Sequence, residues 1–209
     1  MNADFIGQVG DADTLVAFFP GVPAAQRDDI QDALLYAHLF ASHQHDVQQQ
    51  WHGWMQYYRN RLEKCGFVRQ SLVVKDSVLL SSRDDIDTAS FRILGATASD
   101  NVRALVRNAV VRLGIKQMAL SYFDGGRLSA RMGSFQIVPC EMSGAGQVGV
   151  LLCGLRVSTD QASPDARRLI MHFKGGSYSF DPRGYDTQRQ AVHSYLAGKA
   201  NAVIRQIEL

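Results

Sequence analysis

Cysteines and long apolar runs are both scarce in this chain of 209 residues. The three cysteines, Cys65, Cys140 and Cys153, are odd in number and lack metal-site spacing, so we expect free thiols in a reducing compartment. The longest apolar run, residues 148–155, is much shorter than the ~18 residues that a membrane-spanning helix needs. The first residues show no signal-peptide pattern. We therefore expect a cytoplasmic protein, or one exported by a route independent of a signal peptide.

A charge excess of either sign is also missing. Lysine and arginine together number 22, and aspartate and glutamate number 20, which gives a net charge of +2. A charge this small provides no general attraction to nucleic acid, so a nucleic-acid partner is not predicted. Hydrophobic residues make up 46% of the chain, which is enough for a folded domain with a core.

Motifs for cofactors and metals are lacking. The glycine-rich stretch at residues 125–134 (GGRLSARMGS) matches neither phosphate-binding motif, and a hairpin turn explains it. Helix capping explains the aspartates at positions 84, 85 and 87. Four histidines lie within fifteen residues but have no zinc-motif spacing: His38, His43, His45 and His52. No cofactor and no bound metal are predicted.

Helical spacing dominates the first third of the chain. Helices are predicted at residues 13–19, after Pro23 and from Trp51 to Cys65, and residues 1–10 are predicted to be loose. The third helix has the clearest pattern, because its apolar residues recur at steps of three and four: Trp51, Trp54, Met55, Tyr58, Leu62 and Cys65. Residues 1–66 are therefore predicted to form an N-terminal helical region.

Strand patterns dominate the second half. A strand-like segment at residues 67–81, broken near Lys75-Asp76, and helices at about 84–94 and 99–113 precede them. The predicted later strands cover residues 117–122, 128–142, 147–159 and 168–180. The Ser/Gly-rich break SGAGQ between two of them indicates a β-hairpin, and the Gly175-Gly176 pair indicates one bent strand or a second hairpin. A last helix is predicted at about residues 186–207.

This order of elements predicts an α+β fold. N-terminal helices would precede a mostly antiparallel sheet built from the second half, and the C-terminal helix would pack on that sheet. Short hairpin loops join antiparallel neighbours only, which favours this sheet type. Residues 67–209 are predicted to form the α+β core, and together with residues 1–66 one compact domain.

Three motifs resemble those of a group of small uncharacterised microbial proteins. The first is W-x2-W-M-x-Y-Y-x6-C-G-F at residues 51–67, an aromatic helix that ends in Gly-Phe. The second is the strand G-S-F-Q-I-V-P-C at residues 133–140, and the third is the closing I-x2-I-E-L at residues 204–209. The resemblance implies a compact domain with its C-terminal helix built into the core. It implies no activity and no site residues.

The aromatic helix also contains the strongest candidate for a binding surface. Trp51 and Trp54 share one helical face with Tyr58, and Tyr57 points away from that face, flanked by Arg59. Exposed Trp, Tyr and Arg side chains are typical of binding hot spots and of membrane-interface helices. The alternative is that the tryptophans pack against the sheet. The candidate binding residues are therefore Tyr57, Arg59, Trp51 and Trp54.

Two classes of function follow. The first is a non-enzymatic binding or assembly protein that associates with itself, with a protein partner or with a membrane surface; one version is an exported bacterial toxin or virulence-type protein. The second is a thiol- or histidine-dependent hydrolase that uses Cys140 with His172 or His193. The first class is favoured, because no nucleophile lies next to a base and an orienting group in the sequence.

Overall fold

The computed structural model describes residues 5–9, 14–72, 77–80, 134–159, 168–197, 199 and 204–206. Within these residues the chain forms eight strands and three helices. The strands are β1 (Phe5–Val9), β2 (Thr14–Phe18), β3 (Phe67–Leu72), β4 (Ser77–Leu80), β5 (Ser134–Met142), β6 (Val148–Thr159), β7 (Leu169–Phe180) and β8 (Ile204–Gln206). The helices are α1 (Ala24–Gln44), α2 (Trp51–Lys64) and α6 (Pro182–Ala197).

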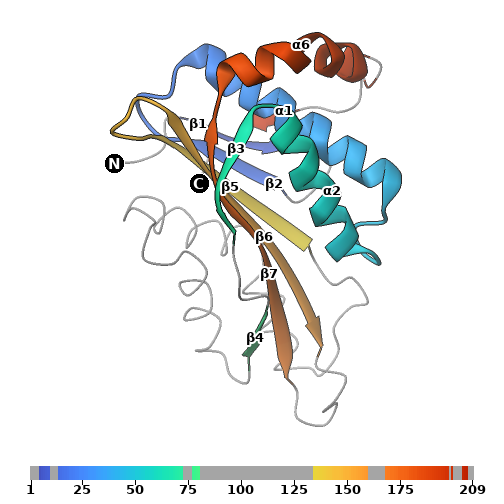
Figure 1. Cartoon of the computed structure of the whole chain (residues 1–209). Helices are drawn as coiled ribbons and strands as arrows, with labels where there is room; N and C mark the ends of the chain where they lie inside the picture. The colour runs from blue at the N-terminus through green and yellow to red at the C-terminus, as the bar shows by residue number, and fades with distance from the viewer. Residues whose placement is uncertain are drawn as a thin grey trace.

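The described strands form one sheet in the order β3-β7-β6-β5-β2-β1-β8. β4 pairs with the first part of β7, while β3 pairs with its last part. All pairs are antiparallel except β2 with β5, which is parallel. The three helices lie together over one end of this sheet, and β6 and β7 extend beyond them (Figure 1). The predicted α+β fold is confirmed.

The hairpin predicted from SGAGQ is present as β5, a turn and β6. Met142 pairs with Val148, and the amide of Ser143 donates to the carbonyl of Gln147 at 2.8 Å. Cys140 pairs with Val150 in this register, while Cys153 pairs with Ile137, so the two thiols do not face each other. All three cysteines are free.

β7 continues through the Gly175-Gly176 pair without a turn. Of the two sequence interpretations of this segment, the single strand is therefore correct. Both glycines are needed because neighbouring backbone approaches them closely: a Cβ at Gly175 would overlap the carbonyl oxygen of Leu152 in β6, and one at Gly176 would overlap that of Ser71 in β3. Glycine inside a strand often marks such an approach.

The prediction of a helix at residues 13–19 is wrong. Thr14–Phe18 form β2, and all five residues are buried in the middle of the sheet. A short apolar run buried on both faces has no alternation, so periodicity does not distinguish it from a helix. Phe5–Val9, predicted to be loose, form β1 beside it. The N-terminal region therefore supplies two strands of the sheet as well as α1 and α2.

The predicted C-terminal helix is too long. α6 ends at Ala197, and Ile204–Gln206 form strand β8 against β1. Gly198, with its low helix propensity, directly follows the last helical residue. α6 contacts α1 most extensively, and its buried residues are Tyr185 and Val192.

Several predicted elements lie outside the described residues. These are the helices at about 84–94 and 99–113, the strand at 117–122 and the aspartates at 84, 85 and 87. The predicted strand-like segment at 67–81 forms two strands, β3 and β4, on either side of the predicted break, and both pair with β7.

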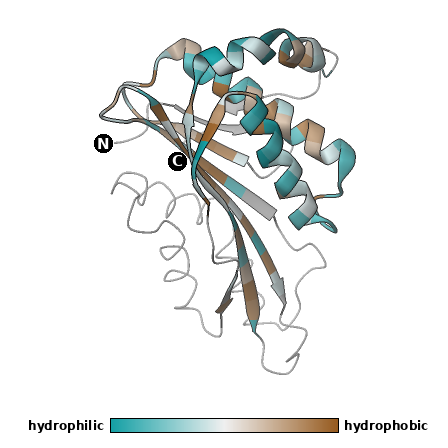
Figure 2. Ribbon diagram, in the orientation of Figure 1, coloured by the Kyte–Doolittle hydropathy of each residue, from teal (hydrophilic) through white to brown (hydrophobic). Residues whose placement is uncertain are grey.

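The main core lies between the helices and the sheet. Trp51, Trp54 and Tyr58 of α2 are buried against sheet residues such as Val150 and Tyr178. Figure 2 shows hydrophobic residues along β6 and β7 and many hydrophilic ones on the helices above. The predicted inward face of α2 is confirmed.

Candidate functional site

Both tryptophans of the candidate binding set are buried. Trp51 and Trp54 are each 1% exposed. The indole N–H of Trp54 donates to Ser42 Oγ of α1 at 3.0 Å, and its ring stacks on Tyr58 with 5.0 Å between centroids. The two side chains therefore hold α2 against α1 and the sheet. This agrees with the alternative that the tryptophans pack in the core and do not form a binding surface.

Tyr57 is exposed, but Arg59 does not lie beside it. Tyr57 is 43% exposed and points away from the core. A step of two residues turns a helix by about 200°, so Arg59 is on the opposite side of α2. On that side, burial raises the pKa of Tyr178 in β7, and the positive charge of Arg59 opposes the rise. The structure thus separates the two polar members of the predicted set.

A groove between α1 and α2 brings Tyr57 together with other residues. Its volume is about 430 Å³. The lining residues are Phe40, Tyr57, Asn60, Arg61, Glu63 and Lys64. Tyr57, Asn60, Arg61 and Lys64 follow helical spacing, so they form one outer face of α2. That spacing was a readable signal in the sequence, whereas Phe40 comes from another helix.

Arg61 is the central residue of this groove. Its guanidinium carbon lies 3.4 Å from the centroid of the Phe40 ring, and its Nη1 donates to the hydroxyl of Tyr36 at 3.3 Å. Such stacking fixes a guanidinium over an aromatic face and leaves the remaining N–H groups free to donate. Arg61 is therefore held in place before any partner arrives.

The aromatic and cationic contacts continue beyond the groove. Tyr36 meets Tyr195 of α6 edge to face at 5.1 Å, and Lys199 lies 5.3 Å from the Tyr195 ring centroid. Within the described part of the chain, Arg61 forms no salt bridge. Glu63 does form one, because its Oε1 lies 3.7 Å from Nη1 of Arg69. A series of aromatic and cationic contacts therefore runs from Phe40 and Arg61 through Tyr36 and Tyr195 to Lys199.

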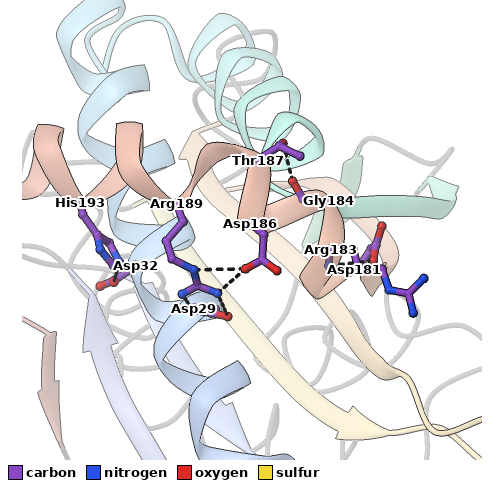
Figure 3. A network of polar contacts seen from close by, with 9 residues as sticks. All are labelled: Asp29, Asp32, Asp181, Arg183, Gly184, Asp186, Thr187, Arg189 and His193. Atoms are coloured by element: carbon purple, nitrogen blue, oxygen red, sulfur yellow. Dashed lines mark hydrogen bonds and ion pairs between the residues drawn. The ribbon is translucent and has the colours of Figure 1, made fainter.

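An ion-pair network fixes α6 on α1 (Figure 3). Asp29 of α1 is buried and receives two hydrogen bonds from the guanidinium of Arg189, which also donates to Asp186 at 2.7 Å. These hydrogen bonds raise the pKa of Arg189. Nearby, His193 Nε2 lies 3.2 Å from Asp32. Burial raises the pKa of Asp32, and His193 opposes that rise.

We expect Arg189→Ala to lower the free energy of unfolding by about 2 kcal/mol or more. Removing one partner of a buried ion pair leaves the other charge uncompensated, and the part of the guanidinium in solvent keeps the cost below the ~3–5 kcal/mol of a fully buried pair. Adding Asp29→Asn should recover part of the loss, because it removes the buried charge. Urea unfolding of both variants at pH 7 measures this. Equal stability of Arg189→Ala and wild type would show that the network contributes nothing.

The structure does not bring Cys140 next to either candidate histidine. Cys140 is fully buried, its Sγ lies 3.7 Å from the carbonyl oxygen of Val138, and burial raises its pKa. His172 pairs with Arg156, six residues along β6 from the Val150 that faces Cys140, which corresponds to ~20 Å. His193 is on α6 beside Asp32. The arrangement needed for a thiolate nucleophile is therefore not formed by these residues.

The buried thiols predict a loss of stability at alkaline pH. Burial raises the pKa of Cys65 from 9.0 to about 11. Between these two pH values the folded state keeps the thiol proton that the unfolded chain releases. The contribution of Cys65 to the free energy of unfolding is therefore fully present below pH 9 and is lost as the pH rises to about 11. The size is on the order of 2 kcal/mol. In Cys65→Ala, the fall in unfolding free energy between pH 8 and pH 11 should be smaller than in wild type; an identical fall would contradict the assignment.

Three of the four clustered histidines lie against different side chains. His38 lies against Trp54, and His45 meets Tyr57 edge to face at 4.7 Å. His52 lies 6.1 Å from His172 of β7, between ring centroids. Across the described ranges, no group of three or more His, Cys, Asp or Glu side chains is placed to hold a metal ion.

Comparisons with known proteins do not assign the chain to a family. No family model matches the chain, and no curated protein matches it. A search of solved structures finds a chain described as "Structure of the Evf virulence factor", with 12% identity over 93% of this chain and 82% of that one and a TM-score of 0.38. A likeness of this degree carries no argument. Of the helices that the structure describes, none is long and apolar enough to cross a membrane.

Proposed function

We propose that the protein acts by binding, and that the groove between α1 and α2 receives an acidic segment of a partner protein. The observation that carries the proposal is Arg61, stacked on Phe40 in the groove with no carboxylate partner among the described residues. A guanidinium fixed in this way is suited to a bidentate contact with a carboxylate. Exposed Tyr57 supplies an apolar surface beside it.

The charges around the groove favour an acidic partner. Arg61 and Lys64 line it, and the one acidic lining residue, Glu63, lies near Arg69. Complementary charge mainly increases the association rate and excludes partners of the wrong sign. The chain's net charge of +2 supplies no such attraction by itself, so the local arrangement matters.

The size of the groove favours a peptide segment. A volume of about 430 Å³ is at the small end of the range of ligand pockets and accommodates a few side chains. Tyr and Arg are among the residues enriched in binding hot spots. Self-association, attachment to a membrane surface and a toxin or virulence-type role stay predictions from the sequence.

We expect the double variant Tyr57→Ala/Arg61→Gln to lose peptide binding. Acidic peptides selected on the wild-type protein from a random library would be labelled, and their Kd measured by fluorescence anisotropy. Truncating interfacial hot-spot residues costs ~2 kcal/mol or more, so the Kd should rise at least about thirtyfold. The matched control is Arg59→Gln, which removes the same charge from the other side of α2 and should leave the Kd within about threefold.

Two further measurements separate the other occupants. Light scattering across a hundredfold concentration range detects self-association, and sedimentation with vesicles of anionic lipid detects membrane binding. Suppose that self-association or vesicle binding is strong, that the double variant abolishes it, and that no acidic peptide binds. The proposed class of partner, an acidic protein segment, would then be wrong. If Arg59→Gln weakens peptide binding as much as the double variant does, the groove is not the site.

A further inference from the structure

A serine and a histidine meet on the sheet next to the start of α2. Ser158, near the end of β6, and His172, near the start of β7, lie with Oγ and Nε2 3.0 Å apart. Both side chains are on the sheet face that carries α2, since His172 lies against Trp51 and His52. Both residues are partly buried and keep some exposure to solvent.

The surroundings of this pair are basic and aromatic. Arg156 lies directly opposite His172 in the β6–β7 register, two residues before Ser158 and on the same face. Its Nη2 donates to the carbonyl oxygen of Gln48 at 2.7 Å, which holds the guanidinium near the start of α2. Burial lowers the pKa of Arg156, and its guanidinium nevertheless stays charged at neutral pH.

We propose that Ser158 and His172 form a nucleophile–base pair that cleaves carboxylic esters, with Arg156 as the group that stabilises negative charge. A serine hydroxyl within hydrogen-bond distance of an imidazole nitrogen is the arrangement that activates serine as a nucleophile. An arginine two residues away on the same face of the strand can stabilise the oxyanion that forms when the carbonyl is attacked. This inference goes beyond the proposed binding function and concerns a different part of the molecule.

The reaction balances with an ester and water alone. Ser158 Oγ bonds to the acyl carbon while its proton passes to His172 Nε2, and the resulting oxyanion faces Arg156. The bond between the acyl carbon and the alcohol oxygen then breaks, and the proton on Nε2 goes to the departing alkoxide. Water, losing a proton to Nε2, attacks the acyl carbon next. The Oγ–acyl bond breaks, the acid leaves, and Oγ regains its proton.

Covalent labelling tests the pair. A fluorophosphonate probe, which forms a bond from phosphorus to a nucleophilic serine with loss of fluoride, would be incubated with the full-length protein, and the labelled peptide identified by mass spectrometry. We expect label on Ser158 and measurable hydrolysis of p-nitrophenyl acetate. His172→Gln keeps a hydrogen-bond acceptor but not the base, so it should slow both reactions about a hundredfold or more without lowering the Tm.

The controls make the test decisive. Ser158→Ala should abolish both reactions. Ser179→Ala, which alters a β7 serine hydrogen-bonded to Gln70 instead of to a histidine, should change neither. The proposal is wrong if Ser158 reacts no faster than Ser179, or if His172→Gln labels at the wild-type rate. Either result would make the Ser158–His172 contact a purely structural link between β6 and β7.

Discussion

Replacing Gly175 by alanine is expected to lower the free energy of unfolding by more than ~3 kcal/mol. The new Cβ would overlap the carbonyl oxygen of Leu152, a backbone atom of the neighbouring strand. Overpacking by a methyl group in a core costs ~1–3 kcal/mol when side chains give way. Here β6 and β7 themselves must separate, and they form the longest strand pair among the described residues.

Gly144→Ala is the matched control. Gly144 lies in the β5–β6 turn, and a Cβ there would meet no heavy atom within 4 Å. Its stability should stay within about 0.5 kcal/mol of wild type. Urea unfolding followed by circular dichroism measures both variants. Similar midpoints for Gly175→Ala and Gly144→Ala would refute the close β6–β7 approach.

Trp54→Ala should cost about 3–5 kcal/mol, because truncating a buried tryptophan leaves a large cavity. Trp54 also loses its stack on Tyr58 and its hydrogen bond to Ser42. Tyr57→Ala, three residues further along α2 and exposed, should change stability by no more than about 0.5 kcal/mol. Thermal unfolding of the two variants compares the inward and outward faces of one helix. A larger effect from Tyr57 would reverse the orientation described for α2.

The parts of the fold that the sequence predicted have strong local patterns. α2 has apolar residues at steps of three and four, and the β5–β6 hairpin has two apolar runs around a Ser/Gly-rich turn. β1, β2 and β8 were missed because they are three to five residues long and exist through pairing with distant strands. Nothing local distinguishes Thr14–Phe18 from one turn of a buried helix.

The candidate sites show the same limit. The sequence predicted that Tyr57 faces away from the core, but it paired Tyr57 with Arg59 because the two are neighbours in sequence. The arginine that lines the groove together with Tyr57 is Arg61. Residues four apart share a helix face, so Arg61 is closer to Tyr57 than Arg59 is, and Arg61 stacks on Phe40 of α1. The Ser158–His172 contact depends on the register of β6 against β7, which sequence alone does not supply.

Mapping a selected acidic peptide onto the protein by NMR tests the binding proposal most directly. Amide shifts of the 15N-labelled protein would be followed during titration with the peptide. The account predicts that the largest shift changes fall on residues 36–40 and 57–64, along both walls of the groove, and disappear in Tyr57→Ala/Arg61→Gln. Saturable changes confined to another surface, or none with any selected peptide, would contradict it.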